Sequence, residues 1–111
     1  MNDNIIKSID TANKIEKHKS SLQLCEQYLS MLQHTPTEAA AYKANQYATE
    51  IYEDIKGDDL EIAIENTCPY PRNVDILTRA KDNLRAVIKM LKQILVKELK
   101  EESDNINDII K

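Results

Sequence analysis

The sequence has little of what makes turns, pockets and disulfides. Its 111 residues include one glycine, three prolines, two cysteines and no Trp or Phe. So few glycines and prolines leave few places to turn, which predicts long helices. Since Gly57 is the only glycine, the chain has no glycine-rich phosphate loop. Without large rings, the core must consist of aliphatic residues and tyrosine, which favours helix-on-helix packing over a deep ligand pocket.

The cysteines and the N-terminal residues give no sign of secretion or of a metal. Cys25 and Cys68 form no CxxC motif and no cluster with His18 or His34, so neither a disulfide framework nor a zinc site is indicated. The first ten residues are interrupted by polar side chains and contain no long apolar run. We therefore expect a cytoplasmic protein with no membrane association and no cofactor.

The length and the periodicity predict one all-α domain over residues 1–111, folded as a three-helix antiparallel bundle. The first helix is expected at about residues 3–34. Its apolar positions alternate steps of three and four, as in a coiled-coil seam. These positions are Ile15, His18, Leu22, Cys25, Leu29 and Leu32.

The second helix is expected at residues 36–56. In the run Thr35-Pro36-Thr37-Glu38, Thr35 can cap the helix, Pro36 suits its first position and Glu38 can complete a capping box. Small residues along one stripe, such as Ala44 and Ala48, would allow close packing. Gly57 is predicted to end the helix in a left-handed cap.

The third helix is expected at residues 74–101, followed by a tail at 102–111 that can fray. Its apolar positions have heptad spacing, namely Leu77, Ala80, Leu84, Val87, Leu91 and Ile94, with Ile88 and Leu95 widening the stripe. Between the helices, residues 58–67 fit either a strand or one turn of helix. We favour a short helix, because a single strand has no partner. Pro69 and Pro71 then require an extended connector.

The predicted helix lengths leave part of the first helix uncovered. At 1.5 Å per residue it is roughly 45 Å long against about 30 Å for the second helix. The uncovered part would expose Ile5, Ile6 and Ile9. Segment 58–67, the isoleucines near the C-terminus or a second copy could cover them, and we favour a homodimer.

Charge is unevenly distributed along the chain. Residues 50–65 carry −6 and residues 72–100 carry +5, within a total of −4. If the second and third helices are antiparallel, Arg72, Arg79 and Lys81 would lie near Glu53 and Asp54. The attraction between these opposite charges would then hold the two helices in that arrangement. The alternative is two solvated faces with weak ion pairs.

A basic stripe on the third helix could follow the phosphates of a nucleic acid. It consists of Lys81, Arg85, Lys89 and Lys92. The acidic isoelectric point of about 5.2, the absence of a helix-turn-helix spacing and the lack of interleaved aromatics argue instead for a solvated face.

Carboxylates on the second helix and just after it are the main catalytic alternative. They are Glu50, Glu53, Asp54, Glu61 and Glu65, and helix-borne clusters of this kind hold Mg²⁺ in some all-α nucleotide pyrophosphohydrolases. The first and third helices, however, contain no matching carboxylates or base-binding residues. His18 is expected to be a core histidine and His34 to complement the helix dipole. No base is spaced to activate Ser20, Ser21 or Cys25.

Tyrosine suggests a protein interface. Tyr42, Tyr47 and Tyr52 are five residues apart, so they point around the helix axis and at least one should be exposed. Tyr42, Tyr52 and Tyr70, with Ile5, Ile6 and Ile9, are the candidate interface residues. The sequence thus favours a non-enzymatic module that binds another protein, including a second copy of itself: an adaptor, inhibitor or assembly chaperone of bacterial or phage type. A metal-dependent nucleotide-processing enzyme and a weak nucleic-acid binder are the alternatives.

Overall fold

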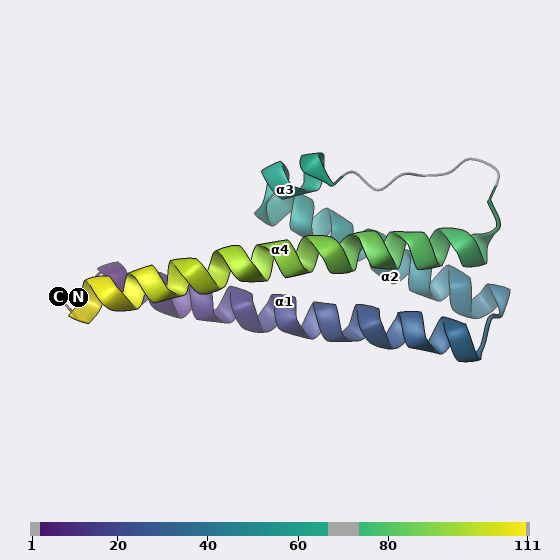
Figure 1. Cartoon of the computed structure of the whole chain (residues 1–111), viewed down its shortest axis with the longest axis horizontal. Coiled ribbons are helices and arrows are strands. Elements are labelled where there is room, and N and C mark those ends of the chain that lie inside the picture. The colour runs from purple at the N-terminus through teal and green to yellow at the C-terminus, as the bar shows by residue number, and fades with distance from the viewer. Residues whose placement is uncertain (1–2, 67–73, 111) are drawn as a thin grey trace.

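The computed structural model describes residues 3–66 and 74–110, and these form an all-α bundle (Figure 1). The elements are α1 (Asp3–His34), α2 (Glu38–Asp58), α3 (Leu60–Glu65) and α4 (Ile76–Ile110). The predicted fold class, with a long first and a long last helix, is confirmed. None of the helices in the described residues combines the length and the apolar character needed to cross a membrane.

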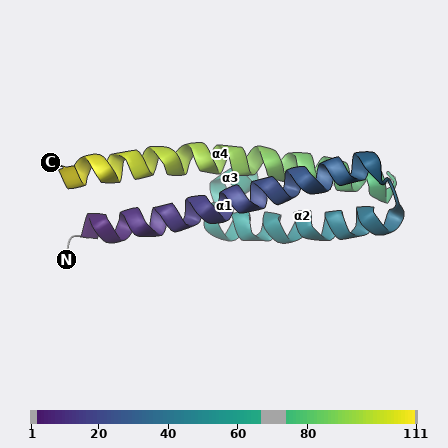
Figure 2. The same ribbon diagram turned by 90° about the horizontal axis from the view of Figure 1, so that it is seen from below.

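The helix directions differ in one respect from the antiparallel expectation. Helix α1 runs opposite to α4 and α2, but α2 and α4 run the same way (Figures 1 and 2). One hydrogen bond joins Asn45 of α2 to Asn83 of α4, and another joins Asp59, directly after α2, to Lys97 of α4. Both pairs are 38 residues apart in the sequence. The start of α4 therefore lies beside the start of α2. Arg79 and Lys81 do not lie near Glu53 and Asp54 at the other end of α2, so the predicted contact between them is wrong. Arg72 lies outside the described residues.

The boundaries of α2 correct two predictions. Its N-cap is Thr37 instead of Thr35, and the Thr37 hydroxyl accepts a hydrogen bond from the backbone N–H of Ala40. This hydrogen bond satisfies one of the free N–H groups in the first turn of the helix. The helix begins two residues later than predicted, because residues 35–37 form the connection between α1 and α2. Gly57 forms no left-handed cap. It lies inside α2, which continues to Asp58.

The short helix predicted within residues 58–67 is present as α3. Asp59 ends α2 and begins α3, since its backbone N–H donates to the carbonyl of Ile55 and its side chain accepts from the N–H of Ile62. The helical alternative over the strand is thereby confirmed. Ile62 and Ala63 are buried, while Leu60 and Ile64 are exposed.

Helix α4 is longer than predicted. It continues through residues 102–110, which we expected to fray, because this part packs along the beginning of α1. The Ser8 hydroxyl donates to Glu102 Oε1 at 2.6 Å and marks this contact. A polar tail in the sequence is therefore a paired helix in the structure.

The core lies where α1, α2 and α4 meet. Its largest fully buried side chains include Leu32, Leu84 and Leu91. On α2 the core positions are mostly alanines, which let the other two helices approach closely. Leu22 and Leu29 are half-buried and pack against the same cluster as Leu84 and Leu91.

Beyond the end of α2 the molecule narrows to two helices. The side chain of Asp58, the last residue of α2, contacts Lys17 and His18 of α1, so residues 3–16 of α1 and 99–110 of α4 extend past it (Figure 2). We call this part the arm and the three-layered remainder the body. The molecule measures 55 × 26 × 17 Å, and the arm accounts for its elongation.

Candidate functional site

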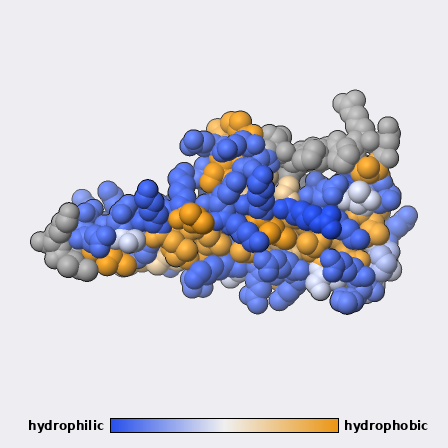
Figure 3. Space-filling model, in the orientation of Figure 1, coloured by the Kyte–Doolittle hydropathy of each residue, from blue (hydrophilic) through white to orange (hydrophobic). Residues whose placement is uncertain are grey.

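The arm exposes more large apolar side chains than two helices can cover. Ile5, Ile6 and Ile9 of α1 are exposed, as predicted. On α4, Leu99, Ile106 and Ile109 are exposed as well. The end of α4 thus lies beside the predicted patch without burying it. Segment 58–67 does not bury it either, since Leu60 and Ile64 of α3 are themselves exposed. Figure 3 shows apolar side chains at the surface of the arm.

The charges of α4 divide between the body and the arm. Residues 101–110 include four acidic residues and no basic one, whereas basic residues predominate from Arg79 to Lys100. The helix therefore presents a basic first part and an acidic last part. A ligand that spans both must have the opposite order of charges.

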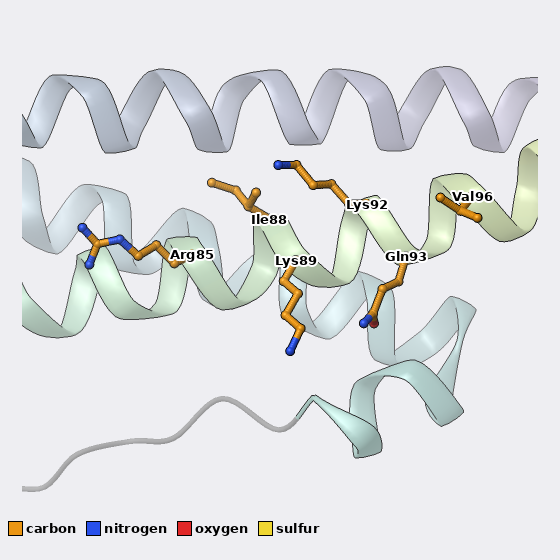
Figure 4. Close-up of a pocket in the computed structure, with 6 residues that line it drawn as sticks. All are labelled: Arg85, Ile88, Lys89, Lys92, Gln93 and Val96. Atoms are coloured by element: carbon orange, nitrogen blue, oxygen red, sulfur yellow. The ribbon is translucent and has the colours of Figure 1, made fainter.

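An open groove of about 580 Å³ follows α4 where the basic stripe lies (Figure 4). The described residues that line it are Arg85, Ile88, Lys89, Lys92, Gln93 and Val96. Ile88, Lys92 and Val96 lie on one side of α4, and Lys89 and Gln93 lie on the side toward α3. Lys81 is only half-exposed and Arg85 is 3.7 Å from Asp82. The structure thus combines these cations with apolar side chains instead of presenting a purely basic surface.

A buried polar cluster joins the arm to the body. His18 is 3% exposed; its Nδ1 lies 2.7 Å from Oε1 of Glu98, which is also buried, and its Nε2 lies 3.3 Å from Oδ2 of Asp58. Lys17 donates to the same Asp58 oxygen at 3.1 Å. The cluster therefore fixes the end of α2 against both long helices.

The geometry of this cluster leaves no ring nitrogen free for catalysis. A doubly protonated imidazole can donate to Glu98 and Asp58 at once. A general base needs an unoccupied nitrogen within reach of a proton on the substrate. His18 is thus a buried histidine with satisfied hydrogen bonds, as the sequence predicted. Because its two nitrogens face carboxylates on opposite sides of the ring, the three residues also do not converge on one metal position.

Charge pairing controls the acidity of the two aspartates at the end of α2. Burial acts to raise the pKa of Asp58, but the hydrogen bonds and charges of Lys17 and His18 outweigh it and lower that pKa. Lys97 Nζ lies 2.7 Å from Asp59 Oδ2. This hydrogen bond lowers the pKa of Asp59 and raises the pKa of Lys97. Both aspartates are therefore held in the ionised form.

The other candidate reactive groups do not assemble into a site. Among the described residues, no three or more His, Cys, Asp or Glu side chains are placed to hold a metal ion, and this includes the carboxylates of α2 and α3. Burial, followed by the charge of Glu26, raises the pKa of Cys25 to about 12, so its thiol is not a nucleophile at neutral pH. His34 lies exposed at the end of α1.

The tyrosines of α2 face different directions, as their spacing predicted. Tyr42 is exposed, Tyr52 is half-buried and Tyr47 packs on Tyr28 with ring centroids 5.1 Å apart. None of them lies on the arm. Tyr70 lies outside the described residues. The structure therefore does not bring the predicted tyrosines and isoleucines into one surface.

Sequence reasoning missed the partners of His18, although a signal was present. Glu98 continues the heptad positions Leu84, Leu91 and Ile94 of α4, just as His18 occupies an apolar position in α1. A histidine and a glutamate at core positions of neighbouring helices are a recognisable hydrogen-bonding pair. Asp58 gave no such signal, because it follows the only glycine, where we expected the helix to end.

Compared with protein-family models, with curated proteins and with solved structures, the chain matches none of them. Its function must therefore be inferred from its own surface.

Proposed function

We propose that this protein is a non-enzymatic module that binds another helical protein through the arm. The observation that carries the proposal is the set of exposed large apolar side chains on two adjacent helices, namely Ile5, Ile6, Ile9, Leu99, Ile106 and Ile109. Large apolar side chains gathered on the surface of one part of a domain are commonly an interaction site. An adaptor, an inhibitor or an assembly chaperone would use such a surface.

The shape of the arm suggests the kind of partner. Two antiparallel helices present a shallow channel between their side chains, and an amphipathic helix fills such a channel with residues spaced three and four apart. A helix added beside the arm would also restore the layered packing that α2 supplies in the body. The partner is therefore expected to contribute at least one amphipathic helix.

A pair of matched variants tests this proposal. Leu99→Asp places a charge on the arm, and Leu60→Asp does the same on α3. The two leucines are 50% and 53% exposed, so the substitutions are comparable. Self-association is measured by sedimentation equilibrium, and binding of other proteins by affinity capture from the source cells with mass spectrometry.

We expect the wild type to bind a protein, either itself or another, and we expect Leu99→Asp to lose that binding while Leu60→Asp retains it. Equal behaviour of the wild type and both variants in the two measurements would contradict the proposal. Circular dichroism of each variant verifies that it is folded.

A further inference from the structure

Helix α4 carries a second stripe beside the one that forms the core. The flank stripe, as we call it, runs at alternating steps of four and three, which is the spacing of a coiled-coil seam. It consists of Ile88, Lys92, Leu95, Leu99, Glu102 and Ile106. Lys92, Leu99 and Ile106 are exposed and Ile88 is half-exposed, whereas Leu95 is buried and Glu102 is half-buried, with its Oε1 accepting a hydrogen bond from Ser8. The stripe begins in the groove of Figure 4 and continues onto the arm.

The flank stripe is symmetric about position 97. When the helix is laid antiparallel on a copy of itself with this position at the centre, each residue meets its mirror position. Ile88 then lies opposite Ile106 of the second copy, and Leu95 lies opposite Leu99. Lys92, the stripe's only cation, lies opposite Glu102, its only anion.

We propose that the occupant of this face is a second copy of the chain, with the two α4 helices antiparallel and in this register. The inference rests on the proposed function and identifies its partner. Each of the six layers of the seam would be either apolar against apolar or cation against anion. The pairing has a two-fold axis, which repeats each kind of layer once on either side of position 97. Two-fold symmetry is the commonest symmetry of a homodimer.

The overall charges of α4 favour the same direction. An antiparallel pair places the acidic residues 101–110 of each copy beside the basic part that contains Arg85 and Lys92. A parallel pair would place acid beside acid and Lys92 beside Lys92. Charge thus favours the antiparallel arrangement and disfavours the alternative.

The arm helix α1 adds to the same contact. Ser8 donates to Glu102, so Ile5 and Ile9, each within one helical turn of Ser8, lie at the level of Glu102 and Ile106. From Ile88 to Ile106 the flank stripe spans 18 helical steps, or about 27 Å of helix. Isoleucines on α1 enlarge an interface that a single pair of helices of this length would leave small.

Charge exchange between two variants tests the register. Lys92→Glu alone places Glu opposite Glu102 in both symmetry-related layers, and Glu102→Lys alone places Lys opposite Lys92. Mixing the two variants restores a cation opposite an anion in both layers. Lys89→Glu is the matched control, because it makes the same charge change on the groove side that faces α3.

In sedimentation equilibrium over about a hundredfold range of concentration, the wild type should reach twice the monomer mass of 12.8 kDa. Each variant alone should have a dissociation constant raised roughly tenfold or more. The equimolar mixture should return toward the wild-type value, and Lys89→Glu should change it little.

Three results would overturn this inference. The first is a wild-type mass near 12.8 kDa throughout. The second is a dimer that Lys92→Glu and Lys89→Glu weaken equally, and the third is a mixture that dissociates as readily as its components. Since Glu102→Lys also removes the bond to Ser8, Leu99→Asp is the second test and should yield a folded monomer.

The failure of this inference can be told apart from the failure of the proposed function. A wild type that stays monomeric but captures a different protein through Leu99 rejects the self-pairing and keeps the proposed function. A dimer that forms without any dependence on Leu99 or Lys92, together with a capture of other proteins that Leu99→Asp leaves unchanged, rejects both.

Discussion

The body and the arm contain the same two helices, α1 and α4, yet they bury them to different extents. In the body, α2 covers both long helices, and Leu32, Leu84 and Leu91 are fully buried. In the arm, Thr11 and Ile15 are buried, but Ile5, Ile9 and Ile106 stay exposed, because two helices alone enclose few side chains on all sides. The comparison shows that burial here depends on the third helix and much less on the hydrophobicity of the residue. The body therefore supplies stability, and the arm is left with exposed apolar surface.

The strongest test of this contrast is a core truncation in the body. Leu91→Ala should cost on the order of 2–5 kcal/mol of unfolding free energy, since Leu91 is fully buried and a cavity would remain. Urea unfolding followed by circular dichroism measures the loss. A loss below about 1 kcal/mol would mean that Leu91 is not in the core.

The second test concerns the junction between the two regions. Glu98→Ala leaves Nδ1 of His18 buried without its acceptor, which should cost about 1–3 kcal/mol. The double variant with His18→Ala should lose less than the sum of the two single losses, because the two groups interact directly. Additive losses in the same unfolding measurement would show that the pair does not couple the helices.

The third test removes the cap between α2 and α3. Asp59→Ala should cost about 0.5–2 kcal/mol, because the side chain caps α3 at Ile62. Lys97→Ala is the informative companion, as it removes the ion pair and keeps the cap. If the two substitutions lower the unfolding free energy by the same amount, the ion pair and not the cap stabilises this junction.

Acid should weaken the junction by a predictable route. The pKa values of Asp58 and Asp59 are lowered from their ordinary value of 3.8, so their ionised forms stabilise the folded state. This contribution is complete above the ordinary value and is lost as the pH falls through it toward the folded pKa. Urea midpoints between pH 6 and pH 3 should fall more steeply for the wild type than for Asp58→Asn/Asp59→Asn. Parallel curves would contradict this origin of acid sensitivity.

The smallest effect is expected in the arm. Ile9→Ala should change the unfolding free energy by about 0.5 kcal/mol or less at protein concentrations low enough to keep the chain monomeric, because Ile9 is exposed. At high concentration the loss should increase if the arm is an interface, since association stabilises the folded state. A large loss at every concentration would place Ile9 in the core of the single chain and remove the difference between arm and body.

Several features of this protein follow from its sequence alone. The scarcity of glycine and proline and the three-and-four spacing from Ile15 to Leu32 and from Leu77 to Ile94 determine the long helices, because these patterns act over neighbouring residues. The exposure of Ile5 and Ile9 also followed, from helix lengths only. His18 was correctly placed in the core.

Tertiary structure decided the rest, since it depends on which helices meet. The pattern of α2 is compatible with either direction relative to α4, and only packing made the two parallel. The polar residues 102–110 remain helical because α1 lies beside them. Gly57 stays inside α2 because the next two residues, Asp58 and Asp59, form hydrogen bonds with His18 of α1 and Lys97 of α4. Local sequence determined the helices of this protein, and contacts between residues far apart in the chain determined where those helices end and which faces they leave open.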